Sequence, residues 1–251
     1  MNLVVANENK RGEIKQMIDS FDQEGETFWQ KRNTVKVFEL KGQKMVIKSF
    51  KIPHLINRFA YRYIRKSKAR RSYEHATVLL EKGMRTPKPI AYQEDVDIVG
   101  LKKSFYVSEN LDYDFDFNAL YDIDFSDRKN ILEQFAEFTY DLHEKGIHHF
   151  DHSRGNTLII DKKDRTYDFY LIDLNRMVFE DMNYQKRVDN FNRLGLTPEM
   201  IKIISKKYAE LIDVDEEKVF KDISHSCEQF DTNRAKKKKL KSKFGLGSSI
   251  S

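Results

Sequence analysis

Three polar residues in the second half of the chain have the types and the spacing that phosphoryl transfer needs. His149, Asp151 and Asn156 lie in one short segment, and the aspartate and the asparagine are five positions apart. On a loop, a carboxylate can orient an attacking hydroxyl group and accept its proton, while an amide oxygen can bind a magnesium ion. We therefore expect Asp151 to act as the catalytic base and Asn156 as a metal ligand, with His149 packed beneath the loop as a brace.

A further acid follows at the end of an apolar run. Residues 169–172 read Phe-Tyr-Leu-Ile, and Asp173 comes directly after them. An acid at the end of a strand beside such a loop is well placed to bind the same cation. Asp173 is therefore the second expected metal ligand. A transition-metal site at the neighbouring histidines is disfavoured because they lack the i, i+4 spacing of a helical histidine pair.

Hydrophobic spacing predicts the elements that position this loop. Four apolar residues between 131 and 142 recur at helical spacing, which predicts a helix over 127–144 that ends before Gly146. Short strands are expected at 157–160 and 168–173, on either side of a polar turn. The loop therefore joins a helix to a strand, and both can hold its polar side chains in place.

The rest of the chain predicts strands first and helices later. This order indicates an α+β fold with two lobes, a small N-lobe built on an antiparallel sheet and a compact, mainly helical C-lobe. We expect an N-terminal helical extension over 1–24, the N-lobe over 25–108 and the C-lobe with the catalytic loop over 109–231. The remaining expected elements are a helix over 10–21, a hairpin of 34–40 and 44–50, helices over 54–65 and 68–82, strands within 90–107, a short helix with a loop over 113–126, and helices within 183–231.

Composition excludes several classes of protein. The chain has 251 residues, of which 39% are hydrophobic and 34% charged, and this is typical of a soluble globular protein. Its one cysteine, Cys227, cannot form an intramolecular disulfide, which favours a reducing compartment. The sequence has no apolar run long enough for a spanning helix or a secretory signal. A cytoplasmic location is therefore expected.

Positive charge is concentrated at the C-terminal end. Residues 232–251 contain seven lysines and arginines and no acid, whereas the whole chain has a formal charge of +5, so residues 1–231 carry −2. Such a run is usually solvated, and we expect a disordered tail over 232–251. Peripheral contact with an anionic membrane is also expected, because each basic residue near such a surface can contribute about 1 kcal/mol. Nucleic acid is a weaker option.

A second basic region lies inside the folded part. Between Lys44 and Arg71 there are ten lysines and arginines and no acid, and apolar residues alternate with them at helical spacing. This pattern suits a helix that packs on one side and meets anions on the other. An anionic acceptor, which a membrane could hold, would fit it.

In its context the loop motif resembles the protein-kinase-like superfamily. That resemblance implies that Lys48, in the strand-like Met-Val-Ile-Lys, binds the α- and β-phosphates of ATP and that Glu74 on the next helix orients it. It implies that backbone groups of Glu109 and Leu111, in the connector between lobes, bond the adenine. The region that would cover the phosphates, 30–35, contains no glycine, and Asn33 and Thr34 are the expected phosphate contacts there.

Departures from the protein-kinase pattern indicate a different branch. Ser153 occupies the place of a lysine, Leu-Asn follows Asp173 in place of Phe-Gly, and no Ala-Pro-Glu follows, so a protein substrate is disfavoured. Over about residues 30–195 the chain resembles the lipopolysaccharide kinase family, through the compact C-lobe, the junction at 83–89 and the basic region 44–71. The resemblance implies Mg²⁺-dependent transfer of the ATP γ-phosphate to a hydroxyl of 3-deoxy-D-manno-octulosonic acid (Kdo) or heptose in a lipid A precursor, by a cytoplasmic and often membrane-associated enzyme.

The acceptor implied by this resemblance is a lipid-linked anionic sugar. Arg62, Arg65 and Arg154 are the expected ligands of its carboxylate or phosphates, since arginine pairs with both in a bidentate manner. Two alternatives stay open. The missing glycines and the basic tail would suit a catalytically weak pseudokinase that binds a membrane or a partner, and the acidic stretch 109–127 would suit a small-molecule kinase similar to aminoglycoside phosphotransferases.

Overall fold

The computed structural model describes residues 1–51, 61 and 65–243. The chain divides into two compact units. Unit 1 consists of Met1–Tyr113 and Tyr170–Arg176, and unit 2 consists of Asp114–Phe169 and Met177–Ser251. The short second segment of unit 1 contains Asp173, so two stretches distant in sequence build this unit.

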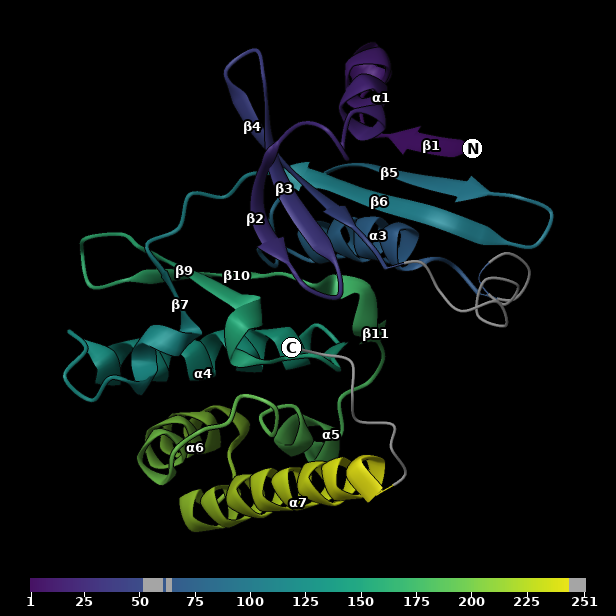
Figure 1. Cartoon of the computed structure of the whole chain (residues 1–251). Helices are drawn as coiled ribbons and strands as arrows, with labels where there is room; N and C mark the ends of the chain where they lie inside the picture. Colours follow the sequence, from purple (N-terminus) through teal and green to yellow (C-terminus); the bar gives the residue numbers. More distant parts are fainter. Residues whose placement is uncertain (52–60, 62–64, 244–251) are drawn as a thin grey trace. The chain divides into compact units, whose positions relative to one another are not determined.

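An antiparallel six-stranded sheet forms the centre of unit 1 (Figure 1). The expected hairpin is confirmed, because strand 34–40 pairs with strand 43–49 and places Val35 opposite Lys48. The strand Asn2–Val5 was not expected from the sequence, since four residues are too few to show an alternating pattern. In sheet order the strands are β1 (Asn2–Val5), β5 (Pro89–Val96), β6 (Leu101–Glu109), β4 (Gln43–Ser49), β3 (Thr34–Leu40) and β2 (Glu26–Gln30).

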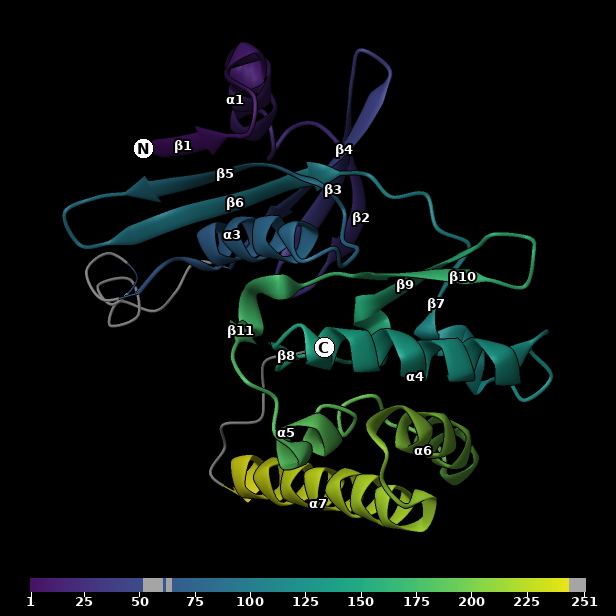
Figure 2. The same ribbon diagram turned by 180° about the vertical axis from the view of Figure 1, so that it is seen from behind.

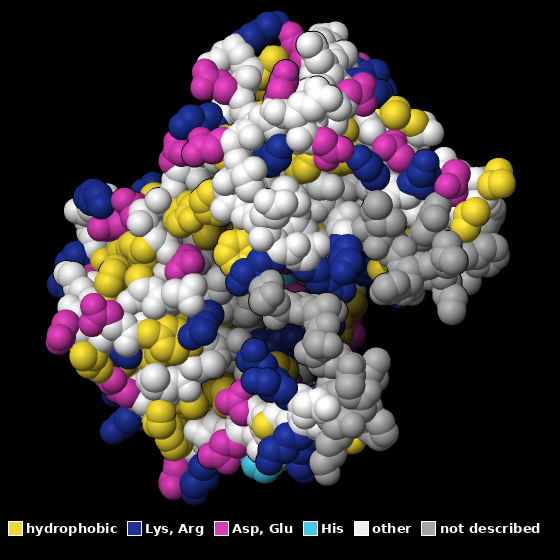
Figure 3. Space-filling view, viewed as in Figure 1, with side chains coloured by type: hydrophobic (Ala, Val, Ile, Leu, Met, Phe, Trp, Pro, Cys, Tyr) yellow, Lys and Arg dark blue, Asp and Glu magenta, His cyan; other side chains and the backbone are white. Residues whose placement is uncertain are grey.

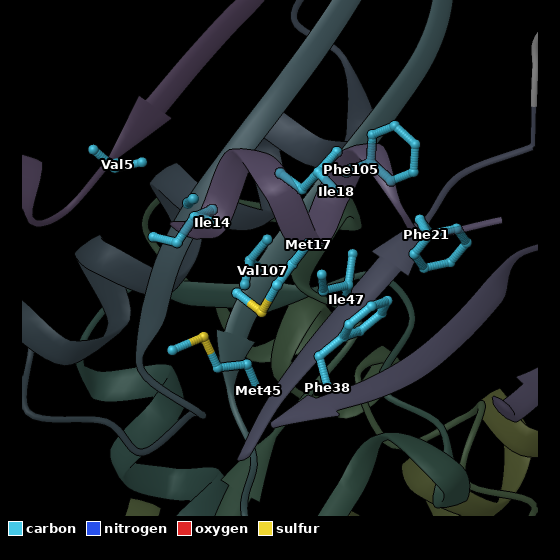
Figure 4. Packing of buried hydrophobic residues seen from close by; sticks show 11 residues of the cluster. Val5, Ile14, Met17, Ile18, Phe21, Phe38, Met45, Ile47, Phe105 and Val107 are labelled. Atoms are coloured by element: carbon cyan, nitrogen blue, oxygen red, sulfur yellow. The ribbon is translucent and has the colours of Figure 1, made fainter. Parts of the chain in front are cut away.

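One face of this sheet is covered by α1 (Arg11–Asp19), which follows the 3-10 turn η1 (Glu8–Lys10). Met17 of the helix lies beside Val107 of the sheet, and Ile14 and Ile18 belong to the same buried cluster (Figure 4). Ile14, Ile47 and Val107 are fully buried, and each contributes roughly 1.5–3 kcal/mol by leaving water. The helix expected over 10–21 is therefore confirmed, and its apolar stripe forms part of the core of unit 1 together with β1.

The opposite face is covered by α3 (Lys68–Glu81), as the two views show (Figures 1 and 2). Ser67 caps the helix by accepting a hydrogen bond from the Arg70 N–H at 3.1 Å. Ala69 of α3 packs with Tyr92 of β5, which neighbours Ala91 of the α1-side core. Successive strand residues thus serve the two faces in turn. The helix expected over 54–65 lies outside the described residues except for positions 61 and 65.

Unit 2 is mainly helical, with its helices in layers. Figures 1 and 2 show α5 and α6 between α4 and α7, and α6 contacts both of the longer helices. Strand order is β10-β9-β7 in one small sheet and β11-β8 in another. Its elements are β7 (Phe115–Asp116), η2 (Phe117–Tyr121), α4 (Arg128–Glu144), β8 (Ile147–His149), η3 (Arg154–Asn156), β9 (Thr157–Asp161), β11 (Met177–Phe179), α5 (Tyr184–Asp189), α6 (Pro198–Ile212) and α7 (Glu216–Lys243), while β10 (Tyr167–Leu171) passes from unit 2 into unit 1 and is followed there by η4 (Leu174–Arg176).

Helix α4 carries the apolar stripe expected from the sequence. Phe135 is fully buried, and its ring centroid lies 4.5 Å from that of Phe117 and 5.8 Å from that of Phe169. Ile131 and Leu142 on the same stripe are also fully buried. The predicted helix over 127–144 and the strands after the loop are confirmed, as is the mixed α and β content with an antiparallel sheet.

The expectation of a disordered tail from residue 232 is wrong for residues 232–243, which continue α7 to Lys243. The segment is rich in lysine, which favours a helix, and a helix already formed over 216–231 removes the nucleation cost. Repulsion between neighbouring lysines is too small to end it.

The surface mixes both signs of charge. On the face drawn in Figure 3, lysine and arginine side chains are interspersed with aspartate and glutamate. In the part of the chain that the structure describes, no helix is both long enough and apolar enough to cross a membrane.

Candidate active site

The loop that carries Asp151 is fixed by its own backbone in unit 2. It enters from α4 through Gly146, whose φ of +67° ends the helix. The Asp151 N–H donates to His149 Nδ1 at 3.1 Å, and Asn156 Nδ2 donates to the Asp151 carbonyl oxygen at 2.8 Å. These bonds hold the two expected chemical residues together on one turn. The Asp151 side chain is 29% exposed, so its carboxylate is accessible to a substrate.

A buried polar chain lies beneath this loop. Asn190 Nδ2 donates to the His149 carbonyl oxygen at 2.9 Å, and His143 Nε2 donates to Asn190 Oδ1 at 3.1 Å. With Nε2 protonated, His143 Nδ1 accepts from the Tyr208 hydroxyl at 2.6 Å. His143 and His149 are almost fully buried, and burial lowers the pKa of His143 to about 3. His143 is therefore neutral near pH 7, and His149 is buried and hydrogen-bonded beneath the loop, as expected from the sequence.

Asp151 also has a cationic partner that the sequence did not reveal. Arg193 Nη1 lies 3.3 Å from Asp151 Oδ1. Arg193 stands between α5 and α6, 42 positions from Asp151, in a segment with no motif around it. No local signal could have identified it, since only the folding of unit 2 brings the two side chains together.

The second group of expected residues meets in unit 1. Lys48 Nζ on β4 lies 2.8 Å from Asp173 Oδ1. Asp173 has a φ of +58°, a conformation that non-glycine residues rarely adopt. Its segment is held by α3, because His75 Nδ1 donates to the Leu174 carbonyl oxygen at 2.8 Å. Such a strained residue, held by its neighbours, is typical of a functional site.

The expected pairing of Glu74 with Lys48 is wrong. Glu74 instead pairs with Lys66 at 2.7 Å and with Arg70, one turn earlier on α3, at 2.9 Å. These two cations hold the pKa of the Glu74 carboxyl below its usual range against the opposing effect of burial. The physical reason is local, since an i, i+4 arginine is always within reach of the glutamate. Lys48 has Asp173 as its acidic partner.

A further lysine near Lys48 was also missed. Lys68 is the first residue of α3 and is half-buried. Burial lowers the pKa of its ammonium, and the charges of Arg32, Arg71 and Lys48 lower it further, while Asp173 raises it. Three cations and one acid therefore act on the charge of Lys68. Such a group of mainly positive charges suits the phosphates of a nucleotide.

The remaining residues expected to bind the nucleotide have the following places in unit 1. Asn33 Oδ1 accepts from the Lys51 N–H at 3.3 Å, so its amide ties the turn to the end of β4. Thr34 begins β3. Glu109 ends β6, and its N–H donates to the Lys88 carbonyl oxygen at 2.9 Å; Leu111 follows two positions later, outside the strand.

The three arginines expected to bind the acceptor are placed differently. Arg154 lies in unit 2 on η3, exposed, with its guanidinium 5.0 Å from the centroid of the Tyr121 ring. Arg65 belongs to unit 1 and lies 4.4 Å from the Tyr61 ring centroid. Arg62 is outside the described residues.

The donors fit magnesium and a nucleotide. The Lys48 ammonium beside the Asp173 carboxylate joins a phosphate ligand to a hard cation ligand, and Asn156 uses its Nδ2 in the loop, leaving Oδ1 for a cation. Asp173 belongs to unit 1 and Asn156 to unit 2. Among the described residues, no cluster of three or more histidine, cysteine or acidic side chains could hold a metal ion by itself.

A loop with an exposed aspartate and an asparagine, together with a lysine–aspartate pair next to a sheet, defines a kinase-like chain. The model of the Lipopolysaccharide kinase (Kdo/WaaP) family matches residues 8–214. The chain belongs to this family, which confirms the resemblance seen in the sequence. Family membership implies phosphorylation of a sugar hydroxyl with ATP as the donor.

A solved structure has the same fold. The structure described as "WaaP in complex with acyl carrier protein" is 19% identical in sequence, and the match covers 94% of this chain and 99% of that chain with a TM-score of 0.63. At this identity the likeness concerns the fold alone. Comparison with curated proteins gives no match.

Proposed function

We propose that the protein is an ATP-dependent sugar kinase that transfers the γ-phosphate to a hydroxyl of Kdo or heptose in the inner core of a lipopolysaccharide precursor. The observation that carries this proposal is the exposed Asp151 carboxylate, fixed beside Asn156 by backbone hydrogen bonds. In this proposal unit 1 is the nucleotide-binding N-lobe and unit 2 is the C-lobe that carries the catalytic loop and binds the acceptor.

Unit 1 binds ATP. Lys48 binds the α- and β-phosphates, and Lys68 and Arg32 supply the positive charge that glycine-rich backbone amides supply in other kinases. The backbone groups of Glu109 and Leu111 bind the adenine. Asn33 and Thr34 shape the turn over the phosphates. Glu74 acts indirectly, by holding Lys66 and Arg70 at the start of α3.

Unit 2 supplies the base. Asp151 accepts the proton of the acceptor hydroxyl while the hydroxyl oxygen forms a bond to the γ-phosphorus. The bond between this phosphorus and the β-γ bridging oxygen breaks, and ADP leaves. A magnesium ion held by Asn156 and Asp173 would neutralise the charge of the phosphates. The brace of His143, Asn190 and His149 keeps Asp151 in place, so little reorganisation is needed during the reaction.

Transfer of labelled phosphate tests this function. Mg-ATP labelled at the γ-position is incubated with a Kdo-bearing lipid A precursor, a heptose-bearing core, casein and an aminoglycoside. Labelling of one of the two lipopolysaccharide acceptors alone, lost in Asp151→Ala, is the expected result. Labelling of the aminoglycoside alone would favour the small-molecule kinase. ATP-independent partner binding with no transfer to any acceptor would favour the pseudokinase.

Peripheral contact with an anionic membrane is part of the proposal. Exposed lysines from Lys236 to Lys239 follow one another on α7, and their attraction to lipid should fall with salt. Sedimentation with vesicles containing 30% phosphatidylglycerol tests this, because a variant with these four lysines changed to glutamine should remain in solution. The complex in the solved relative makes an acyl carrier protein a second candidate partner, and it would compete with the vesicles if it shares this surface.

A further inference from the structure

Asp151 forms an ion pair with Arg193 that a competing anion can break. The Arg193–Asp151 pair has a length of 3.3 Å, and the two side chains are 35% and 29% exposed. Pairs of this exposure contribute little to stability, because water and salt screen them. An anion of higher charge density or better geometry can therefore take Arg193 from Asp151 at little cost.

Arg193 and Arg154 are each placed against an aromatic ring. The Arg193 guanidinium lies 4.9 Å from the centroid of Phe230 on α7, and that of Arg154 lies 5.0 Å from the centroid of Tyr121. Both distances suit cation–π attraction, which limits the orientations that each guanidinium takes. A guanidinium on a ring keeps its edge free for hydrogen bonds, and this planar fork matches a carboxylate or a phosphate.

The two arginines belong to one framework around Asp151. The Tyr121 hydroxyl donates to the carbonyl oxygens that directly follow Arg193 in the chain, with a distance of 2.6 Å to that of Gly195. Arg154 stands on the same loop as Asp151, three positions later. The ring that supports Arg154 is thus anchored to the segment that carries Arg193, the partner of Asp151.

We propose that Arg193 exchanges its partner during the reaction cycle, from the Asp151 carboxylate to an anionic group of the acceptor. With the acceptor site empty it pairs with the Asp151 carboxylate, and when an acceptor binds it turns to a carboxylate or phosphate group of that acceptor, where Arg154 joins it. The acceptor's own anion thereby takes the Arg193 guanidinium away from Asp151 Oδ1. An acceptor with no anionic group leaves Asp151 paired with Arg193. This inference rests on the proposed function and names the chemical feature by which the acceptor is selected.

Direct binding measurements test the anion site without turnover. Calorimetric titration compares the methyl glycoside of Kdo with the same glycoside as its neutral methyl ester, and inorganic phosphate serves as a competitor. The wild type should bind the acid about tenfold more tightly than the ester. Arg193→Gln and Arg154→Gln should each lose most of this preference, while Arg165→Gln should keep it. Arg165 is a matched control because it is an exposed arginine of unit 2 paired with an aspartate, Asp127.

An unchanged preference in Arg193→Gln, or no preference in the wild type, would overturn the proposal. Competition by inorganic phosphate that is lost in Arg193→Gln would indicate that a phosphate of the acceptor, as well as a carboxylate, can take the site. Arg193→Lys, which keeps the charge but lacks the fork, should be intermediate, and this fixes the interpretation if the glutamine variant folds poorly.

Steady-state kinetics separates selection of the acceptor from positioning of the base. Arg193→Gln should raise the KM for the acceptor about tenfold and leave the KM for ATP unchanged. Phe230→Leu should give a smaller change of the same kind, because it removes the ring beneath the guanidinium. A lower kcat with unchanged acceptor KM would mean that Arg193 only positions Asp151, which would contradict the proposal. If the wild type binds the acid but transfers no phosphate, the proposed function fails while the anion site stands.

Discussion

Lys48 and Asp173 form an ion pair of 2.8 Å although 125 positions separate them in the chain. Lys48 comes from the middle of a sheet, and Asp173 from the short segment that returns to unit 1 after β10. The pair brings together the residue proposed to bind phosphate and the residue proposed to bind a cation. It also satisfies both charges, which would be costly if the lysine or the acid stood alone in this partly buried place.

Replacing Lys48 should weaken nucleotide binding. Lys48→Met removes a charge-assisted contact to phosphate, so the Kd for ATP should rise about tenfold to a hundredfold. Fluorescence titration with a labelled ATP analogue checks this without turnover. Lys15→Met is the matched control, since Lys15 also pairs with an acid in unit 1 but on the outer side of α1. Equal affinities for the wild type and Lys48→Met would contradict the role of Lys48.

Replacing Asp151 should remove activity and leave the fold intact. Asp151→Asn keeps the size of the side chain but cannot accept the proton, so kcat should fall by about a hundredfold to ten-thousandfold. The lost ion pair is partly exposed, so the free energy of unfolding should change by at most about 1 kcal/mol. Initial rates of ADP release and a thermal melt provide the two readings. Rates like those of the wild type would exclude Asp151 as the base.

Stability should fall in acid because of buried histidines. Burial depresses the pKa of His143 to about 3 from an ordinary 6.5, and it depresses the pKa of His152 as well. Above pH 6.5 these histidines are neutral in both the folded and the unfolded chain and have no effect. Below it the unfolded chain binds their protons and the folded chain does not, so each histidine can cost up to about 1.4 kcal/mol per pH unit.

The measurement is the midpoint of urea unfolding between pH 7.5 and pH 5. His143→Gln should have a lower midpoint at pH 7.5, because it loses packing, but a shallower decline toward pH 5. A decline as steep as that of the wild type would show that His143 does not contribute to the acid sensitivity.

Gly146 should not tolerate a side chain. Its φ is +67°, and an added Cβ would lie 3.0 Å from the Glu180 carbonyl oxygen. Gly146→Ala should therefore destabilise the protein by about 1–3 kcal/mol and lower its Tm by several degrees. Gly12→Ala is the control, because nothing lies within 4 Å of its added Cβ on α1, and it should raise the Tm slightly. Calorimetry compares the two variants, and an equal Tm for both would contradict the strain at Gly146.

The sequence could predict the parts of the site that depend on local pattern. Asp151 and Asn156 share one turn, and the helix before them has an unmistakable apolar stripe, so spacing alone indicated both the residues and their support. Asp173 was also indicated, by its position at the end of an apolar run, and Lys48 by the resemblance to the protein-kinase-like superfamily. Their pairing was not, because it depends on how β10 returns to the sheet.

The other errors also have physical causes. Glu74 was assigned to Lys48 by resemblance, whereas cations close to it on and before α3 compete successfully for its carboxylate. Arg193 reaches Asp151 only through the packing of α5, α6 and α7, to which no local pattern points. The strand β1 is too short to show alternation, and its partner, β5, lies almost ninety residues later.

Helix α7 also fixes the geometry of the basic segment. Because one uninterrupted helix runs from Glu216 to Lys243, residues 232–243 form a rod about 18 Å long rather than a flexible tether. The angular phase of its lysines is therefore set by the buried end of the same helix, where Val219 and Ile223 are fixed in the core. Inserting a single residue near position 232 would turn every later lysine by about 100° without changing the charge of the chain. Comparing the surface binding of this insertion variant with that of the wild type would show whether binding depends on the orientation of the lysines or only on their positive charge.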